Sequence, residues 1–231
     1  MFIAGRALGA MTMALAFALV GAPAWAYERP AGAPEGPAPR ISSDAHTMAQ
    51  WVQRTGDNRG RPFAIMDKKS ARFVVFDGHG RVIGAAAALI GLAPGDHAVP
   101  GIGARPLSRI LPDERTTPAG RFASEPGRNL DGESVVWVDY DAGFAIHRLR
   151  PGPAQERRKE RLASSSPADN RVSLGCIVVA GTFYDSVVAP VLGARKGVVY
   201  VLPETRPVQE FVGTTLAAPA PAAASKDQPR S

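Results

Sequence analysis

Residues 63–89, FAIMDKKSARFVVFDGHGRVIGAAAAL, hold the pattern that decides the fold class. Runs rich in Val, Ile and Phe, which are typical of strands, alternate there with turn residues. Asp77-Gly78-His79-Gly80, between the second and third runs, is a hairpin turn signal. We therefore expect strands at 63–67, 72–77 and 81–89.

On both sides of this stretch, strand patterns outnumber helical ones. Further strands are expected at 121–125, 134–140 and 197–202. Helices are expected at 44–54, 153–163 and 182–191. The sequence therefore predicts a mainly-β domain with a few short helices.

The two ends of the chain differ from its body. A basic start at Arg6, an apolar run over 8–20 and the small-x-small site Ala24-Trp25-Ala26 indicate a signal peptide. The run is shorter than the about 20 apolar residues of a membrane span, so no stable membrane insertion is expected after cleavage; an uncleaved anchor is the alternative. The expected organisation is a signal peptide at 1–26, a Pro/Ala-rich linker at 27–45, a packing helix at 46–61, one domain at 62–205 and a disordered tail at 206–231.

Composition limits the classes of function. Of 231 residues 45% are hydrophobic, which suffices for one substantial core. The 27 Lys and Arg exceed the 21 Asp and Glu, and a net charge of +6 suits an acidic polymer or surface. Aromatic residues are not interleaved with the basic ones and no nucleic-acid-binding motif is visible, so nucleic acid is not an expected partner.

The one cysteine, Cys176, excludes an intramolecular disulfide, although export leads to an oxidising compartment. A lone cysteine is often a buried small hydrophobe. Its context favours a nucleophile instead. Gly175 permits close backbone approach to a ligand, and consecutive amides beside a nucleophile can stabilise a developing oxyanion.

A thiol nucleophile needs a base, for which histidine is best suited near neutral pH. Of the four histidines, His147 follows the apolar run 143–146, which would hold its ring beside a sheet, whereas His46, His79 and His97 fit surface or loop positions. Metal-ligand spacings and a second thiol are absent from the sequence, so no metal or other cofactor is expected. Gly-x-Ser-x-Gly is absent too, which disfavours a serine hydrolase.

These residues resemble the L,D-transpeptidase catalytic-domain (YkuD-type) family over about 62–203. Three features match in order: Asp67-Lys68 in an early hairpin, Thr117-Pro118-Ala119-Gly120-Arg121-Phe122 for the family's Thr-Pro-x-Gly-x-Phe, and His147 followed by Ser173-x-Gly175-Cys176.

The resemblance implies a β-sandwich-like catalytic domain in which Cys176 is the acyl-accepting nucleophile and His147 its base. It also implies that the backbone carbonyl of Arg148 orients the imidazole and that the amides of Gly175 and Cys176 form an oxyanion hole. The remaining implied site residues shape the loop or bind substrate: Ser173, Arg171 and Leu174.

The implied activity is a ping-pong transfer on peptidoglycan tetrapeptide stems, in the periplasm or cell wall, with roles in cell-wall biogenesis and cell shape. Cys176 would form a thioester and release D-alanine. The acceptor stays open between a second stem, water (an L,D-carboxypeptidase) and a lipoprotein amine. A non-catalytic wall-binding protein and a cysteine hydrolase of another amide are the other hypotheses.

The sequence departs from the family pattern at three places. Leu174 stands where the family often has His, and Val178 where it often has Asn or Arg. The stretch between His147 and Cys176 is long and holds a basic insertion at 153–163. Two interpretations of the insertion are equally weighted: a solvated helix forming a lid, or direct recognition of an anionic muropeptide.

Overall fold

The structure, a computed structural model, describes residues 41–215. The predicted signal peptide at 1–26, the linker up to residue 40 and the tail from residue 216 lie outside the described residues. None of the helices in the described part is long and apolar enough to cross a membrane.

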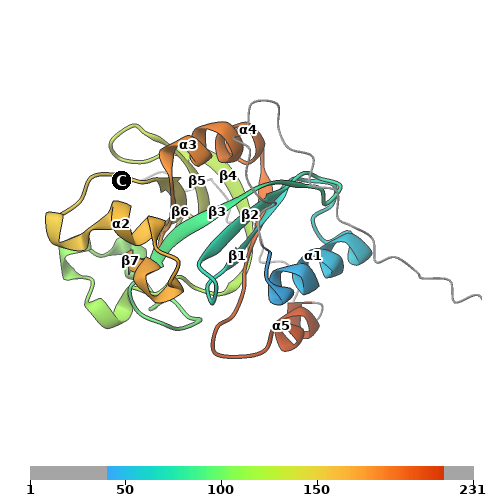
Figure 1. Ribbon diagram of the computed structural model, residues 1–231, viewed down its shortest axis with the longest axis horizontal. Coiled ribbons are helices and arrows are strands. Elements are labelled where there is room, and N and C mark those ends of the chain that lie inside the picture. Colours follow the sequence, from blue (N-terminus) through green and yellow to red (C-terminus); the bar gives the residue numbers. More distant parts are fainter. Residues whose placement is uncertain (1–40, 216–231) are drawn as a thin grey trace, which may run out of the picture.

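The mainly-β prediction is confirmed by a sheet that closes on itself (Figure 1). Its strands follow the order β2-β1-β9-β4-β5-β6-β8-β3, and β2 pairs with β3 to complete the ring, while β7 adds to β3 alone. The bounds are β1 (Phe63–Asp67), β2 (Arg72–Phe76), β3 (Val82–Gly91), β4 (Gly120–Arg128), β5 (Ser134–Asp139), β6 (Phe144–Arg148), β7 (Arg171–Ser173), β8 (Ile177–Val179) and β9 (Gly197–Val201). The two facing layers expected of a sandwich belong here to one sheet that closes on itself, so few strands have an unpaired edge.

The predicted hairpin joins β2 to β3. The Asp77 carboxylate accepts hydrogen bonds from the backbone amides of His79 and Arg81, each at 2.9 Å, and so closes the turn. Pairings between consecutive strands are antiparallel, whereas β1–β9, β6–β8 and β3–β7 are parallel. The parallel pairs join segments far apart in the sequence, which local patterns cannot predict.

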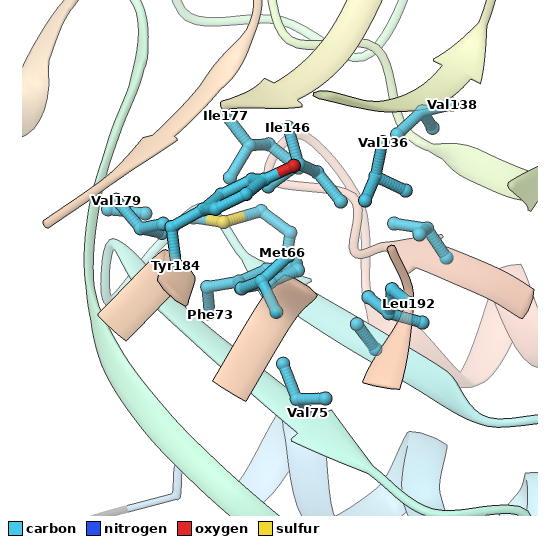
Figure 2. Close-up of a cluster of buried hydrophobic side chains, with 14 of the residues drawn as sticks. Met66, Phe73, Val75, Val136, Val138, Ile146, Ile177, Val179, Tyr184 and Leu192 are labelled. Atoms are coloured by element: carbon cyan, nitrogen blue, oxygen red, sulfur yellow. The ribbon is translucent and has the colours of Figure 1, made fainter. Parts of the chain in front are cut away.

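An inner core fills the ring of strands. Figure 2 shows Met66, Phe73 and Tyr184 packed among the branched side chains of the surrounding strands. Tyr184 comes from the segment that covers one opening of the ring, made of α3 (Gly181–Phe183), the π-helical η6 (Tyr184–Val188) and α4 (Ala189–Val191). The helix predicted at 182–191 is therefore present, with a wide turn in its middle.

An outer core lies between the sheet and two helices, α1 (Ser43–Thr55) and α5 (Val208–Thr215), which lie side by side (Figure 1). α1 begins where the Ser42 hydroxyl accepts a hydrogen bond from the Ala45 amide at 3.1 Å, and it ends at Gly56, whose φ is +64°. Its buried side packs on β1, β2 and β9.

The predicted disordered tail is wrong at its beginning. Residues 208–215 form α5, and its Val208 and Phe211 side chains are buried in the outer core. The Ala/Pro-rich composition further on hid this short amphipathic segment, because burial against α1 outweighs the composition of the tail as a whole.

Short helices fill the long connections. The predicted helix at 153–163 divides into η4 (Ala154–Glu156) and α2 (Arg158–Ala163), with Arg157 at φ +45° between them. Four further 3₁₀ turns are η1 (Ile102–Ala104), η2 (Leu107–Arg109), η3 (Pro112–Glu114) and η5 (Pro167–Asn170). The connections with η1 and η2 border the site.

Candidate active site

A cavity of about 970 Å³ opens beside β6 and β8. Its walls come from segments distant in the sequence, within 98–118, 128–145 and 173–178, together with His147, Arg150 and Arg158. Of the four histidines, His147 alone lines it, and Cys176 lies in the same lining. Tertiary structure therefore brings the two residues singled out by the sequence into one cavity.

Strand register explains why His147 and Cys176 share this face. β6 and β8 are parallel and pair Ile146 with Ile177 and His147 with Val178. Ile146 and Ile177 are fully buried in the inner core, so the side chains next to them in sequence point to the opposite face. His147 is paired with Val178, and Cys176 lies two residues before Val178 on the same face. Since strands are about 4.8 Å apart and two residues span about 6.6 Å along a strand, His147 and Cys176 are diagonal neighbours.

A backbone carbonyl orients the His147 imidazole. Nδ1 lies 2.8 Å from the Arg148 carbonyl oxygen, and because a carbonyl only accepts, Nδ1 carries the proton. Nε2 is then a free acceptor. Burial lowers the pKa of His147; its bond to Arg148 opposes this shift, and the charges of Arg150 and Arg158 add to it. The imidazole is therefore neutral, and able to act as a base, at neutral pH.

The Cys176 thiol is held in its protonated form. Burial raises its pKa, although a hydrogen bond to the Ala145 backbone and the charge of Arg150 act in the opposite direction. Sγ lies 3.5 Å from the Gly143 carbonyl, at the long end of the range for a sulfur donor. A thiol of this kind needs a base to become a nucleophile.

The loop before Cys176 has a conformation that requires glycine. Gly175 has φ +131°, and a Cβ there would lie 2.9 Å from the Thr116 carbonyl oxygen. The Ser173 hydroxyl accepts from the Gly175 amide at 3.1 Å and donates to the Cys176 carbonyl at 2.7 Å. The Ser173 side chain thus holds the backbone on both sides of Cys176.

These contacts correct the expected oxyanion hole. The Gly175 amide is occupied by Ser173, so it is not free to bind an oxyanion. The Cys176 amide has no acceptor within residues 41–215. The oxyanion donor that the geometry supports is therefore the Cys176 amide.

The two predicted substrate-binding residues have different surroundings. Leu174 lines the cavity. Arg171 does not; its guanidinium forms an ion pair with Glu204 and hydrogen bonds with the carbonyls of Gly91 and Ala93. These contacts hold Arg171 in the support of the loop, and the substrate-binding role expected for it stays a prediction.

Sequence reasoning missed Arg105, Arg128 and Arg150 around the cavity, whereas Arg158 belongs to the basic insertion at 153–163. Arg150 pairs with Asp131 at 2.8 Å and with Glu133, and Arg158 pairs with Glu156. The pairs of Arg150 join two connections that lie 17 and 19 positions apart in the sequence, so no local pattern predicts them, whereas Arg158 and Glu156 are local partners. Arg105 and Arg128 line the same cavity.

The described residues contain no group of three His, Cys, Asp or Glu side chains suited to a metal ion. Leu174 and Val178, where the chain departs from the family pattern, are both apolar; Val178 is buried in the sheet and Leu174 is partly exposed in the cavity. The thiol, the imidazole and the Cys176 amide are thus the groups that can carry acyl transfer here.

No protein-family model and no curated protein matches the sequence. Several solved L,D-transpeptidase catalytic domains are similar to the structure. The L,D-transpeptidase from Xylanimonas cellulosilytica is 17% identical with TM-score 0.39, covering 72% of this chain and 64% of its own. The catalytic domain from the E. faecium L,D-transpeptidase is 18% identical with TM-score 0.33, covering 62% and 98%.

The helical cell shape determining protein Pgp2 from Campylobacter jejuni is 15% identical with TM-score 0.42, covering 71% of this chain and 58% of its own. The present chain thus spans less than two thirds of the length of Pgp2. At these identities and TM-scores, the similarity concerns the fold alone.

Proposed function

We propose that this protein is a cysteine acyltransferase of the L,D-transpeptidase type that acts on peptidoglycan peptide stems. One observation carries the proposal: the lone thiol, an imidazole whose Nε2 carries a lone pair, and a backbone amide with no acceptor among residues 41–215 border the same cavity. Nucleophile, base and oxyanion donor are the three parts that acyl transfer through a thioester requires.

In the first half-reaction, His147 Nε2 takes the thiol proton as Cys176 Sγ attacks the carbonyl of the amide between the L-centre and D-alanine. The carbonyl oxygen becomes an oxyanion beside the Cys176 amide. As the C–N bond breaks, the imidazolium returns the proton to the leaving amine, so D-alanine departs and the thioester remains.

In the second half-reaction, His147 takes a proton from the acceptor, which attacks the thioester and releases the thiol. The amine of a second stem gives a cross-link, water gives carboxypeptidase activity, and a lipoprotein amine gives anchoring. The proposed function concerns the acyl donor, which is the peptide stem, and is the same for each of these acceptors.

The charges of the cavity support an anionic peptide as donor. Arg105, Arg128, Arg150 and Arg158 border it, and peptide stems carry carboxylates that guanidinium groups bind well. The apolar side chains of Leu107 and Tyr140 on the same lining can contact the uncharged parts of a stem. The predicted signal peptide supports the periplasm or cell wall as the compartment of this activity.

The test is incubation of the purified protein with a disaccharide-tetrapeptide, followed by mass spectrometry. We expect loss of D-alanine, with cross-linked dimer or tripeptide as product, and no product from Cys176→Ala. His97→Ala, exposed and outside the cavity, is the control and should match the wild type. A folded wild-type protein that binds the stem without releasing D-alanine would favour the wall-binding hypothesis instead.

A further inference from the structure

A buried threonine lies directly behind the cysteine loop. The Thr117 hydroxyl donates to the Gly175 carbonyl at 2.7 Å and accepts from the Gly91 amide at 2.8 Å. Thr117 is 1% exposed and does not line the cavity, although its neighbours Thr116 and Pro118 do. The mechanism above gives it no role.

The bond to Gly175 bears on the amide of the nucleophile. The Gly175 carbonyl and the Cys176 N–H belong to the same planar trans peptide, so they point in opposite directions. With the carbonyl directed at the buried Thr117, the Cys176 N–H is directed away from it, toward the cavity side. A hydrogen bond behind the loop thereby sets the direction of the amide in front of it.

We propose that Thr117 is a positioning residue that aims the Cys176 amide at the oxyanion of the reaction. The inference rests on the proposed function and deepens it. Ser173 holds the next peptide through the Cys176 carbonyl, so the peptides on both sides of the nucleophile are fixed from buried side chains. Gly175, which precedes Cys176, has a φ that other residues rarely adopt, and these hydrogen bonds restrict the backbone at this conformationally permissive position.

Thr117 is itself held by a buried ammonium. Lys68 Nζ donates to the Thr117 carbonyl at 2.9 Å and to the Asp96 carboxylate at 2.8 Å, and the Lys68 side chain is fully buried. Lys68 follows β1, far from the site in sequence. The ammonium anchors the Thr117 backbone, and the Thr117 hydroxyl forms its two hydrogen bonds with Gly175 and Gly91.

The test compares two reagents on the same thiol. p-Nitrophenyl acetate acylates Cys176 through a tetrahedral oxyanion: the S–C bond forms, p-nitrophenolate leaves and the thiol proton passes to His147. Iodoacetamide alkylates the same sulfur by direct displacement of iodide, without an oxyanion. We therefore take the ratio of the acylation rate constant to the alkylation rate constant. A change in thiol reactivity alters both rate constants alike, so a change in this ratio reports on the oxyanion donor.

We expect Thr117→Val, which keeps the shape and loses the hydroxyl, to lower this ratio by about 10²-fold, the size of effect seen when an oxyanion donor is lost. Thr117→Ser, which keeps the hydroxyl, should restore the ratio to within a few-fold of the wild type. Equal ratios in the Val and Ser variants, or an equal loss with both reagents, would overturn the proposal in favour of a purely structural role.

A structure of the wild-type protein acetylated on Cys176 tests the inference without any variant. The thioester oxygen should lie about 2.7–3.1 Å from the Cys176 nitrogen. An oxygen turned away from that amide contradicts the proposal even if Thr117→Val does not fold. Both arms use a small ester, so failure to process peptide stems would refute the proposed function and leave this inference decided on its own result.

Discussion

At the scale of single residues, the site separates a neutral base from a protonated thiol. An unperturbed histidine has a pKa of about 6.5. The structure lowers the pKa of His147 through burial, and it raises the pKa of Cys176 for the same reason. The resting pair at neutral pH is therefore imidazole and thiol, and the proton moves only when the sulfur attacks.

Arg150 should tune both groups, because its positive charge lowers the pKa of His147 and of Cys176. Acylation needs neutral His147, so its rate falls as the pH drops through the lowered pKa, and the midpoint should lie below 6.5. In Arg150→Gln the imidazolium loses a repelling charge, so this midpoint moves to higher pH. The measurement is the pH dependence of Cys176 acylation by p-nitrophenyl acetate.

Arg128→Gln is the matched control, since Arg128 lines the same cavity and bonds to the Gly132 carbonyl. It should leave the midpoint nearly unchanged. His147→Ala should remove the ascending limb altogether, whereas a variant that keeps the wild-type profile would exclude His147 as the base.

The strained amide of a carbapenem gives a direct measure of the nucleophile. Under the proposed function, the thiol of Cys176 should open the ring and form a stable thioester, seen by intact mass spectrometry as a single adduct. Most penicillins should react slowly or not at all. Cys176→Ala should show no adduct; an adduct that persists in that variant would place the acylation on another residue.

At the scale of elements, strand register and one unexpected helix matter most. The register of β6 and β8 puts Ile146 and Ile177 inside and the functional side chains outside, so a slip by one residue would reverse both faces. α5 packs on the outer face of β1, β2 and β9. The opposite face of these strands carries side chains of the inner core.

α5 should contribute measurably to stability although it follows the predicted domain. Phe211 is 4% exposed and packs into the outer core, so Phe211→Ala should lower the free energy of unfolding by about 3–5 kcal/mol. Urea denaturation of the purified protein measures this change. Val212→Ala, at a partly buried neighbour, should cost clearly less, and equal small losses for both would show that α5 does not pack in solution.

At the scale of the whole molecule, a buried ionic group joins three distant segments. Asp96 pairs with Lys68 at 2.8 Å and accepts from the Glu204 and Thr205 amides at 2.9 and 3.0 Å. The hairpin after β1, the connection after β3 and the segment after β9 therefore meet at one carboxylate. Lys68 extends this connection to the Thr117 backbone and so to the cysteine loop.

Removing the charge of Asp96 should be strongly destabilising, because it leaves the buried Lys68 ammonium with only the longer ion pair to Glu204 at 3.5 Å. We expect Asp96→Asn to lower the free energy of unfolding by about 3–5 kcal/mol at pH 7. Urea denaturation is the measurement. Asp113→Asn, at an exposed carboxylate, should change stability by no more than about 0.5 kcal/mol.

The same carboxylate should make stability depend on acid pH. Burial alone would raise the pKa of Asp96, but hydrogen bonds from Lys68, Thr205 and Glu204 hold it far below its ordinary value. A lowered pKa in the folded state gives stability that is present above the unfolded-state value of about 3.9 and is lost as the pH falls below it. Wild-type unfolding between pH 6 and pH 3 should show this loss, and Asp96→Asn should show less of it.

The local features of this protein are predictable from its sequence. Alternation of apolar residues and turn signals placed the strands from Phe63 onward, and the lone cysteine after a glycine, with one histidine ending an apolar run, identified the pair that shares the cavity. These features are encoded within a few residues along the chain. They are therefore visible without knowledge of the fold.

The tertiary structure decided everything that depends on contacts between distant segments. Closure of the sheet, the buried Lys68–Asp96 pair and the bond from Thr117 to Gly175 each depend on contacts between segments far apart in the sequence, and the arginines around the cavity come from separate connections. The lowered pKa of His147 and the packing of α5 follow from burial, which is a property of the assembled molecule. Short-range patterns carry no record of such contacts, because many different sequences satisfy the same local pattern while only the folded chain fixes which groups meet.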